Sequence, residues 1–457
     1  MSHMTIRRLI SLLAVLTPLL LLPSWAQAVP AFAQQTGQPC TTCHIGAFGP
    51  QLTAFGRAFK IAGYTQTGGD AATPIPLSVM LLGSYTNTTK GQGQPAANNY
   101  GSNGNFAMDQ ISIFLAGRVN DYAGGMIQGT FNGITSASHL DNTDLRLTTP
   151  LNVGNSELRI GLDVNNGPTV QDPYNSTYAW GYPYVQSALS LVPTAQPILA
   201  GALSGNSLGA TVYAWYDRSL YVEAGLYNTF GPSLLSYTGN GYGPGSTSAP
   251  APYARVAYEW NWNGQSAEVG GIFMHSDFNP TVATFSVNGA NGHDSYTDMA
   301  LDGGYQWIGD GKNIFSVLGI FDHEARTLSS SYATGAANQP NGALNQVRLS
   351  GTYYYQQTYG ATIGWIKTWG TADPTLYAPA PLTGSANGKP DSNAFILEAD
   401  YVPFGKSDSK YGPWVNLKLG VQYTIYTQFN GGTTNYDGNG RNASDNNTLY
   451  VFAWLIF

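Results

Sequence analysis

The chain has 457 residues and a formal net charge of −7, with 19 Lys and Arg against 26 Asp and Glu. Such a balance offers no electrostatic basis for binding nucleic acid. Only 10% of the residues are charged, against roughly 25% in typical soluble domains, whereas Gly (55) and Tyr (30) are abundant. Few charges, many tyrosines and no long apolar stretch beyond the N-terminus favour an outer-membrane β-barrel, in contact with lipid.

Residues 1–28 are predicted to be a secretory signal peptide. Two arginines precede an apolar stretch at 9–22, and residues 26–28 (Ala-Gln-Ala) are the small residues of a cleavage site. The stretch is short for a transmembrane helix. The sequence leaves open whether the natural start is Met1 or Met4. We expect an exported protein in either case.

The motif Cys40-Thr41-Thr42-Cys43-His44 follows soon after. Two cysteines followed directly by His are typical of covalent haem attachment, in which both thiols join the haem and the His becomes the proximal ligand of the iron. A zinc half-site would need further ligands, and the chain has no other Cys. A thioredoxin-type motif would need a βαβ context, which is not predicted. We therefore expect one haem c, bound by Cys40, Cys43 and His44.

The sixth ligand of this haem is left open. The head after His44 contains no Met and no second His. Met80, Met108 and Met126 are the nearest sulfur candidates, although ordinary packing explains each of them as well. Water or another side chain is the alternative.

Residues 29–70 are predicted to form a small head that contains this motif. Helical spacing predicts one helix over residues 50–62, with Pro50 in its first turn and Gly63 at its end. Such a head is near the lower size limit for an independent domain. It is too small to enclose a haem, so other residues must cover the group.

Two basic residues lie on the polar side of this helix. Arg57 and Lys60 are expected to pair with haem propionates or with acids of the barrel interior, or else to be solvated. The acids considered are Glu157, Glu223, Glu398 and Asp400.

Residues 71–457 show a period of two between clusters of Gly, Asn, Ser and Pro, which predicts strands. Sixteen strands are expected, near 76–86, 107–118, 122–133, 138–150, 155–166, 208–217, 219–229, 251–262, 265–275, 295–308, 312–325, 344–357, 360–370, 391–402, 412–426 and 446–457.

Apolar and polar residues alternate clearly in several of these strands. Leu162 and Val164 face away from Asp163, and Val256 faces away from Arg255. The alternation fits a lipid-exposed barrel with a polar interior, and it also fits a soluble β-sandwich. Links that are short at one end and mostly long at the other favour the barrel, because outer-membrane barrels have this asymmetry. The short-turn end would be periplasmic, and the head begins there.

The last strand has two apolar faces. Its outer face carries Leu449 and Val451, and the opposite face carries Tyr450, Phe452 and Trp454. An aromatic inner face is unusual for a water-filled interior. It indicates packing against the head or the haem, or else ordinary variation with an aromatic girdle.

Four histidines outside the head lie near the predicted long loops: His139, His275, His293 and His323. They are either polar residues of wet loops or a metal-docking surface.

Three segments of the mature chain resemble a known family. The first comprises 33–37, the haem motif at 40–44 and 51–64; the second comprises 164–173 and 179–184; the third is 441–450 at the end. They are similar to the outer-membrane fused monohaem cytochrome c–porin family, which is best known for iron oxidation. The resemblance covers essentially the whole mature chain.

The resemblance implies a one-haem plug inside a sixteen-stranded barrel. It implies a Fe(II) oxidase, of the iron:cytochrome c reductase type, that takes electrons from extracellular Fe(II) and passes them to a periplasmic cytochrome or copper protein. Two other functions stay open: a haem-containing porin or redox-gated channel with a different donor, and a soluble periplasmic haem protein with a β-sandwich.

Overall fold

The structure is a computed structural model. It describes residues 30–68, 77–241, 245–280, 292–406, 408–409, 411 and 414–457. The predicted signal peptide, residues 1–28, lies outside the described residues.

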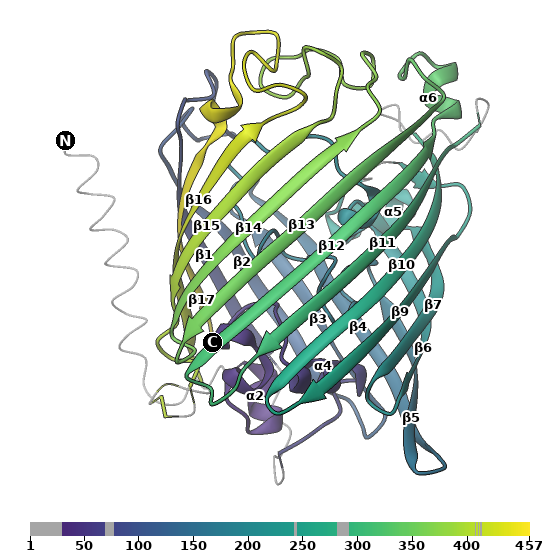
Figure 1. Cartoon of the computed structure of the whole chain (residues 1–457), viewed down its shortest axis with the longest axis vertical. Coiled ribbons are helices and arrows are strands. Elements are labelled where there is room, and N and C mark those ends of the chain that lie inside the picture. The colour runs from purple at the N-terminus through teal and green to yellow at the C-terminus, as the bar shows by residue number, and fades with distance from the viewer. Residues whose placement is uncertain are drawn as a thin grey trace, which may run out of the picture.

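The molecule is a closed antiparallel β-barrel (Figure 1). Its first strand, β1 (Leu77–Thr88), pairs both with β2 (Asn105–Arg118) and with the last strand, β17 (Thr448–Ile456). The sheet therefore has no free edge along this seam, and the β-sandwich alternative is wrong.

The described residues form sixteen long strands and one strand of two residues, β8. The strands between β2 and β17 are β3 (Ala123–Asn132), β4 (Ala137–Val153), β5 (Ser156–Asn165), β6 (Ser207–Tyr216), β7 (Leu220–Thr229), β8 (Ser246–Thr247), β9 (Ala251–Trp262), β10 (Gln265–Asn279), β11 (Asp294–Trp307), β12 (Asn313–Thr327), β13 (Asn341–Tyr355), β14 (Tyr359–Gly370), β15 (Ser392–Tyr401) and β16 (Asn416–Gln428). Each of the sixteen predicted strands corresponds to one long strand.

The barrel exposes its apolar face and buries its polar face. Leu162 and Val256 are 42% and 50% exposed on the outside, whereas Asp163 and Arg255 are buried in the interior. This distribution, together with closure of the sheet, is the architecture of outer-membrane barrels. The predicted alternation is thus confirmed.

Link lengths distinguish the two ends of the barrel. Where β1 begins and β17 ends, most links are short, such as 154–155 and 263–264. We call this the short-turn end. The opposite end carries long links such as 166–206 and 429–447, and we call it the long-loop end. One link there, 133–136, is short.

The head lies inside the barrel at the short-turn end (Figure 1). It consists of α2 (Ala31–Thr36), α3 (Cys40–Cys43), the 3-10 turn η1 (Ile45–Ala47) and α4 (Ala54–Ile61). The other helical segments are η2 (Ile198–Ala200), α5 (Pro232–Thr238), α6 (Ser329–Ala333) and η3 (Ala443–Asn446). None of the described helices is both long and apolar enough to cross a membrane.

The helix predicted over 50–62 begins later than expected, at Ala54. Residues before it pair back onto the haem motif: Leu52 forms an antiparallel bridge with His44, and the Thr53 amide donates to the Cys43 carbonyl at 2.9 Å. Thr53 then caps the helix, because its Oγ1 accepts from the Gly56 amide at 3.1 Å. The prediction of Pro50 in the first turn was therefore wrong.

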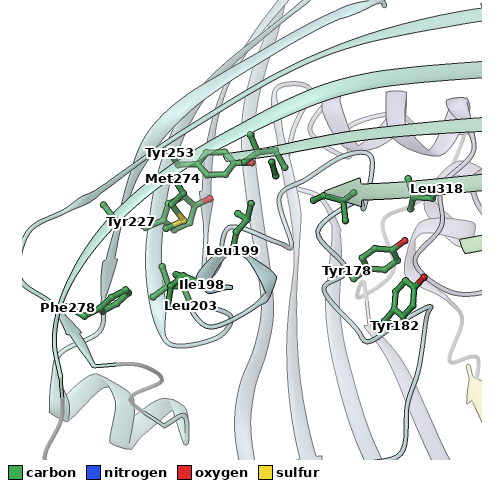
Figure 2. Close-up of a cluster of buried hydrophobic side chains, with 14 of the residues drawn as sticks. Tyr178, Tyr182, Ile198, Leu199, Leu203, Tyr227, Tyr253, Met274, Phe278 and Leu318 are labelled. Carbon is green, nitrogen blue, oxygen red and sulfur yellow. The ribbon is translucent and has the colours of Figure 1, made fainter. Parts of the chain in front are cut away.

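The link 166–206, which we call the inner loop, folds into the barrel instead of extending from it. Its Ile198, Leu199 and Leu203 are buried against wall residues such as Tyr227 and Met274 (Figure 2). The inner loop thus supplies one side of the largest apolar cluster of the interior.

Candidate functional site

One cavity in the short-turn half of the barrel is lined by three of the five residues of the haem motif. Cys40, Cys43 and His44 contribute to its wall, and the empty space amounts to about 1340 Å³, some of it open to solvent. Both cysteines are free thiols. We call this space the head cavity.

The backbone around the motif fixes the orientation of His44. Its amide donates to the Cys40 carbonyl at 2.9 Å, which ends α3, and its own backbone is extended. The next residues turn sharply through Gly46, whose φ of +69° suits glycine. A Cβ at Gly46 would also meet the ring of Tyr354 at 2.1 Å. The tight approach of the head to the barrel wall therefore requires glycine here.

Burial changes the acid–base properties of the motif. It lowers the pKa of His44 to about 4, so the imidazole is neutral near pH 7, which is the form that binds metal ions. The Nδ1 atom of His44 is buried and has no hydrogen-bond partner among the described residues. Burial also raises the pKa of Cys43 to about 12.

The barrel wall completes the head cavity, as the small size of the head requires. The wall residues come from β1, β2, β3, β16 and β17: Ser78, Met80, Phe114, Ala116, Met126, Asn416, Trp454 and Ile456. Two inner-loop residues, Asn175 and Trp180, also contribute.

The structure separates the three methionine candidates. Met80 and Met126 line the head cavity with His44, whereas Met108 does not, and its side chain is 43% exposed on the outside of the barrel. The pairing of β1 with β2 shifts register next to Met108, between Leu82 and Gly83. Such a bulge reverses which residues face inward. Met108 is therefore wrong as a ligand candidate.

The aromatic inner face of the last strand packs against the head, as one of the two interpretations proposed. Trp454 meets Phe48 with ring centroids 5.0 Å apart, and Tyr450 and Phe452 are buried in the same cluster. Close by, Asn416 Nδ2 donates to the Ala47 carbonyl at 2.6 Å.

Arg57 anchors the head to the barrel wall. Its Nη2 lies 2.7 Å from Glu259 Oε1, and both side chains are buried. Its guanidinium also donates to Ser266 Oγ at 3.0 Å and to the Leu52 carbonyl at 2.7 Å. Bidentate pairing of this kind fixes orientation as well as charge.

Lys60 makes the second anchor. Its Nζ lies 3.5 Å from Asp144 Oδ2 and donates to inner-loop carbonyls, at 3.1 Å for Asp172. The four acids considered from the sequence do not pair with Arg57 or Lys60. Instead Glu398 and Asp400 pair with Lys418, Glu157 pairs with Arg159, and Glu223 accepts from Thr211 and Tyr221.

The inner loop covers the head from the long-loop side. Tyr184 OH donates to Gln51 Oε1 at 2.7 Å, and Asn175 Nδ2 donates to the Pro50 carbonyl. One signal of this contact is visible in the sequence, namely the tyrosines at 174, 178, 182 and 184 in a segment without a strand pattern.

A second cavity lies on the other side of the inner loop, and we call it the outer pocket. Its wall residues come from the inner loop and from the long-loop halves of β13 to β17. It has about 1300 Å³ of empty space, some of it open to solvent. Trp180 lines both the head cavity and the outer pocket. One indole side chain therefore belongs to the boundary between the two spaces.

The four histidines do not form a shared centre. His275 and His293 both approach Asp277 Oδ1, at 3.4 and 3.5 Å, and His323 Nδ1 contacts Asn345 Oδ1 at 2.7 Å. Within the described ranges, no group of three or more His, Cys, Asp or Glu side chains is arranged to hold a metal ion. None of the four lines either cavity.

The residues of the head cavity fit a covalent haem. Two free thiols and a neutral imidazole line one largely apolar space. The barrel wall of the same cavity carries two thioether side chains, Met80 and Met126, which are suitable axial donors. This donor set has no counterpart in the outer pocket.

No protein-family profile and no curated protein sequence matches the chain. Solved barrels align over 83% of it at low identity. They include OmpT of Vibrio cholerae, an outer membrane protein (12% identity, TM-score 0.40, 96% of that chain), the outer membrane channel DcaP of Acinetobacter baumannii (13%, 0.43, 96%) and an anion-selective porin from Comamonas acidovorans (11%, 0.42, 98%). Similarity this low carries no argument about function.

Proposed function

We propose that the chain is a c-type cytochrome of the bacterial outer membrane that oxidises extracellular Fe(II) and passes the electron to a periplasmic cytochrome or copper protein. The observation that carries this proposal is the head cavity, where Cys40, Cys43 and His44 line one largely apolar space inside a barrel. A haem bound there would supply a one-electron centre between the two ends of the barrel. The choice of Fe(II) as donor rests on the family resemblance.

Three features of the chain suit electron transfer rather than solute passage. The inner loop occupies the barrel interior, the head fills its short-turn end, and Trp180 borders both the outer pocket and the head cavity. In the proposed orientation the short-turn end is periplasmic. An electron taken from Fe(II) at the long-loop end would then reach the haem inside the barrel, while the oxidised product stays outside the cell.

The test is the absorption spectrum of the purified protein in liposomes after addition of Fe(II). We expect the spectrum to change from oxidised to reduced haem, at both acidic and neutral pH. The double variant C40S/C43S should lose the haem that survives denaturing electrophoresis, whereas T41S, between the two cysteines, should keep it. An unchanged spectrum in the haem-loaded protein at every pH would exclude Fe(II) as the donor.

The second candidate is a haem-containing porin or redox-gated channel with another donor. The porin-like architecture of the barrel favours it. It requires that solute flux depend on the redox state of the haem. Flux that is equal in oxidised and reduced protein would exclude gating.

A further inference from the structure

Arg348 of β13 is a buried cation that has no hydrogen-bond or ion-pair partner among the described residues. It is 8% exposed, lines the outer pocket, and its Nε is buried without a partner. Its guanidinium lies over the rings of Tyr178 and Tyr182, at 5.7 and 6.0 Å from their centroids. These rings stabilise the positive charge from above the plane of the guanidinium. They do not accept hydrogen bonds from its five N–H groups, which point outward within that plane.

Other buried cations of the interior have carboxylate partners. Arg255 lies 2.6 Å from Asp302, and Lys418 lies 3.0 Å from Glu398. Pairing is the usual condition for burying a charge, since an unpaired buried ion is costly. Arg348 differs from these cations because it has no carboxylate partner among the described residues. Its buried, unpaired charge therefore requires an explanation.

Asp322 of β12 does not supply the missing partner. It acts electrostatically on Arg348, but no atom pair between them comes within the 4.0 Å of an ion pair. Its register partner on β13 is Gln346, two residues from Arg348. Asp322 also does not line the outer pocket.

The outer pocket offers an anion a suitable set of neighbours. Of its lining residues in the described part of the chain, Arg348 is the only charged one. Neutral donors surround it, among them Gln186, Ser187, Gln346, Thr368, Asn393 and Thr424. With one cation, several amides and hydroxyls and no lining carboxylate, the pocket is complementary to a negative group.

We propose that the outer pocket is a binding site for a small oxyanion, which the planar fork of Arg348 holds through two parallel hydrogen bonds. Carboxylates, phosphate and sulfate share the geometry that such a fork recognises. The site is distinct from the head cavity, with which it shares the lining residue Trp180. The inference does not depend on haem or on the electron donor.

The test is calorimetric titration of the full-length protein in detergent with citrate, phosphate and sulfate, each alone. We expect at least one of them to bind at millimolar concentration or below. R348Q should weaken that binding by about tenfold or more, since the variant loses the charge-assisted hydrogen bonds of the guanidinium. R348K keeps the positive charge but loses the planar guanidinium. Its affinity for the anion should therefore lie between that of the unchanged protein and that of R348Q.

The matched control is K389Q, which removes one positive charge from an exposed side chain at the long-loop end. It should bind the anion as the unchanged protein does. Citrate preferred over phosphate and sulfate would identify a carboxylate ligand, and the reverse would identify a tetrahedral one. The proposal is overturned if no anion binds, if R348Q and R348K bind normally, or if K389Q weakens binding as much as R348Q. None of these readouts involves Fe(II), so failure of the proposed function leaves the result intact.

Discussion

At the scale of single residues, the interior of this barrel is organised by buried charges. Arg57 and Lys60 bind the head to the wall, and Arg255 and Lys418 each contact two or more acids. Each pair depends on both partners, because removing one leaves an uncompensated charge away from water.

The ion pair between Arg57 and Glu259 gives the first prediction at this scale. R57M should destabilise the docked head by about 3 kcal/mol or more, because Glu259 is left buried and charged. The double variant R57M/E259Q should recover part of this loss, since neither residue is then charged. Limited trypsin digestion of the head and thermal melting measure the effect. Equal destabilisation in both variants would show that the pair contributes only shape.

The axial ligand of the haem gives the second prediction at the scale of single residues. A thioether ligand raises the reduction potential of a haem, so replacing the ligand lowers it. We expect the midpoint potential to fall in M80A or in M126A, and to stay unchanged in M108A, whose side chain lies outside the barrel. Unchanged potentials in all three would mean that water or another side chain is the ligand.

The residues of the haem motif were predictable from sequence because the chemistry lies in five consecutive positions. The partners of Arg57 and Lys60 were not, since Glu259 and Asp144 come from distant strands and their identity depends on barrel register. Met108 was misjudged because a bulge reverses the alternation of β2: Met108 is exposed before it and Ile113 after it.

At the scale of elements, the inner loop is the segment that distinguishes this barrel from an open pore. Asp172 holds its first turn, accepting from the amides of Tyr174 and Ser176 at 3.0 and 2.8 Å. The same carboxylate lies 3.4 Å from Arg255 Nε. One side chain therefore links the loop to the barrel wall.

Asp172 makes the stability of the loop dependent on pH. Burial alone would raise the pKa of Asp172, but Arg255, Lys60 and the loop hydrogen bonds together hold it below its ordinary value of 3.8. A lowered pKa adds stability that is complete above 3.8 and is lost as the pH falls through the lowered value. D172N should therefore lower the melting temperature at neutral pH, and its difference from the unchanged protein should shrink below pH 3.8. A difference that stays constant with pH would contradict this assignment.

Strands and loops differed in how far sequence could predict them. Alternation of polar and apolar residues identified all sixteen long strands, because burial on one face leaves a period of two. No comparable rule exists for the inner loop, whose buried residues follow no period. The tyrosines of the inner loop and its lack of Lys and Arg are signals that it is buried. Its path depends on where the barrel wall places Ser350, Thr352 and Trp365, which form hydrogen bonds with three of these tyrosines.

At the scale of the whole molecule, the head and the inner loop together occupy the barrel interior. This makes a prediction about permeability. Liposomes containing the unchanged protein should admit small sugars slowly. Deletion of both the head (residues 30–68) and residues 170–200 should increase the swelling rate by about tenfold or more, since a sixteen-stranded barrel without these segments is wide enough to leave an aqueous channel. R218Q, in a tight turn, serves as a folded control. Fast swelling of the unchanged protein would show that the interior conducts solutes despite the loop.

The packing of the head against the last strand also has a consequence for how the protein is assembled. The head is made first, yet part of its wall comes from Asn416 and Trp454, more than 360 positions later in the chain. Contacts of such long sequence separation form late, because a long loop must close before they are gained. The head cavity therefore acquires its final polarity only when β17 joins β1. The absorption spectrum of a chromophore in that cavity would report the moment at which the barrel closes.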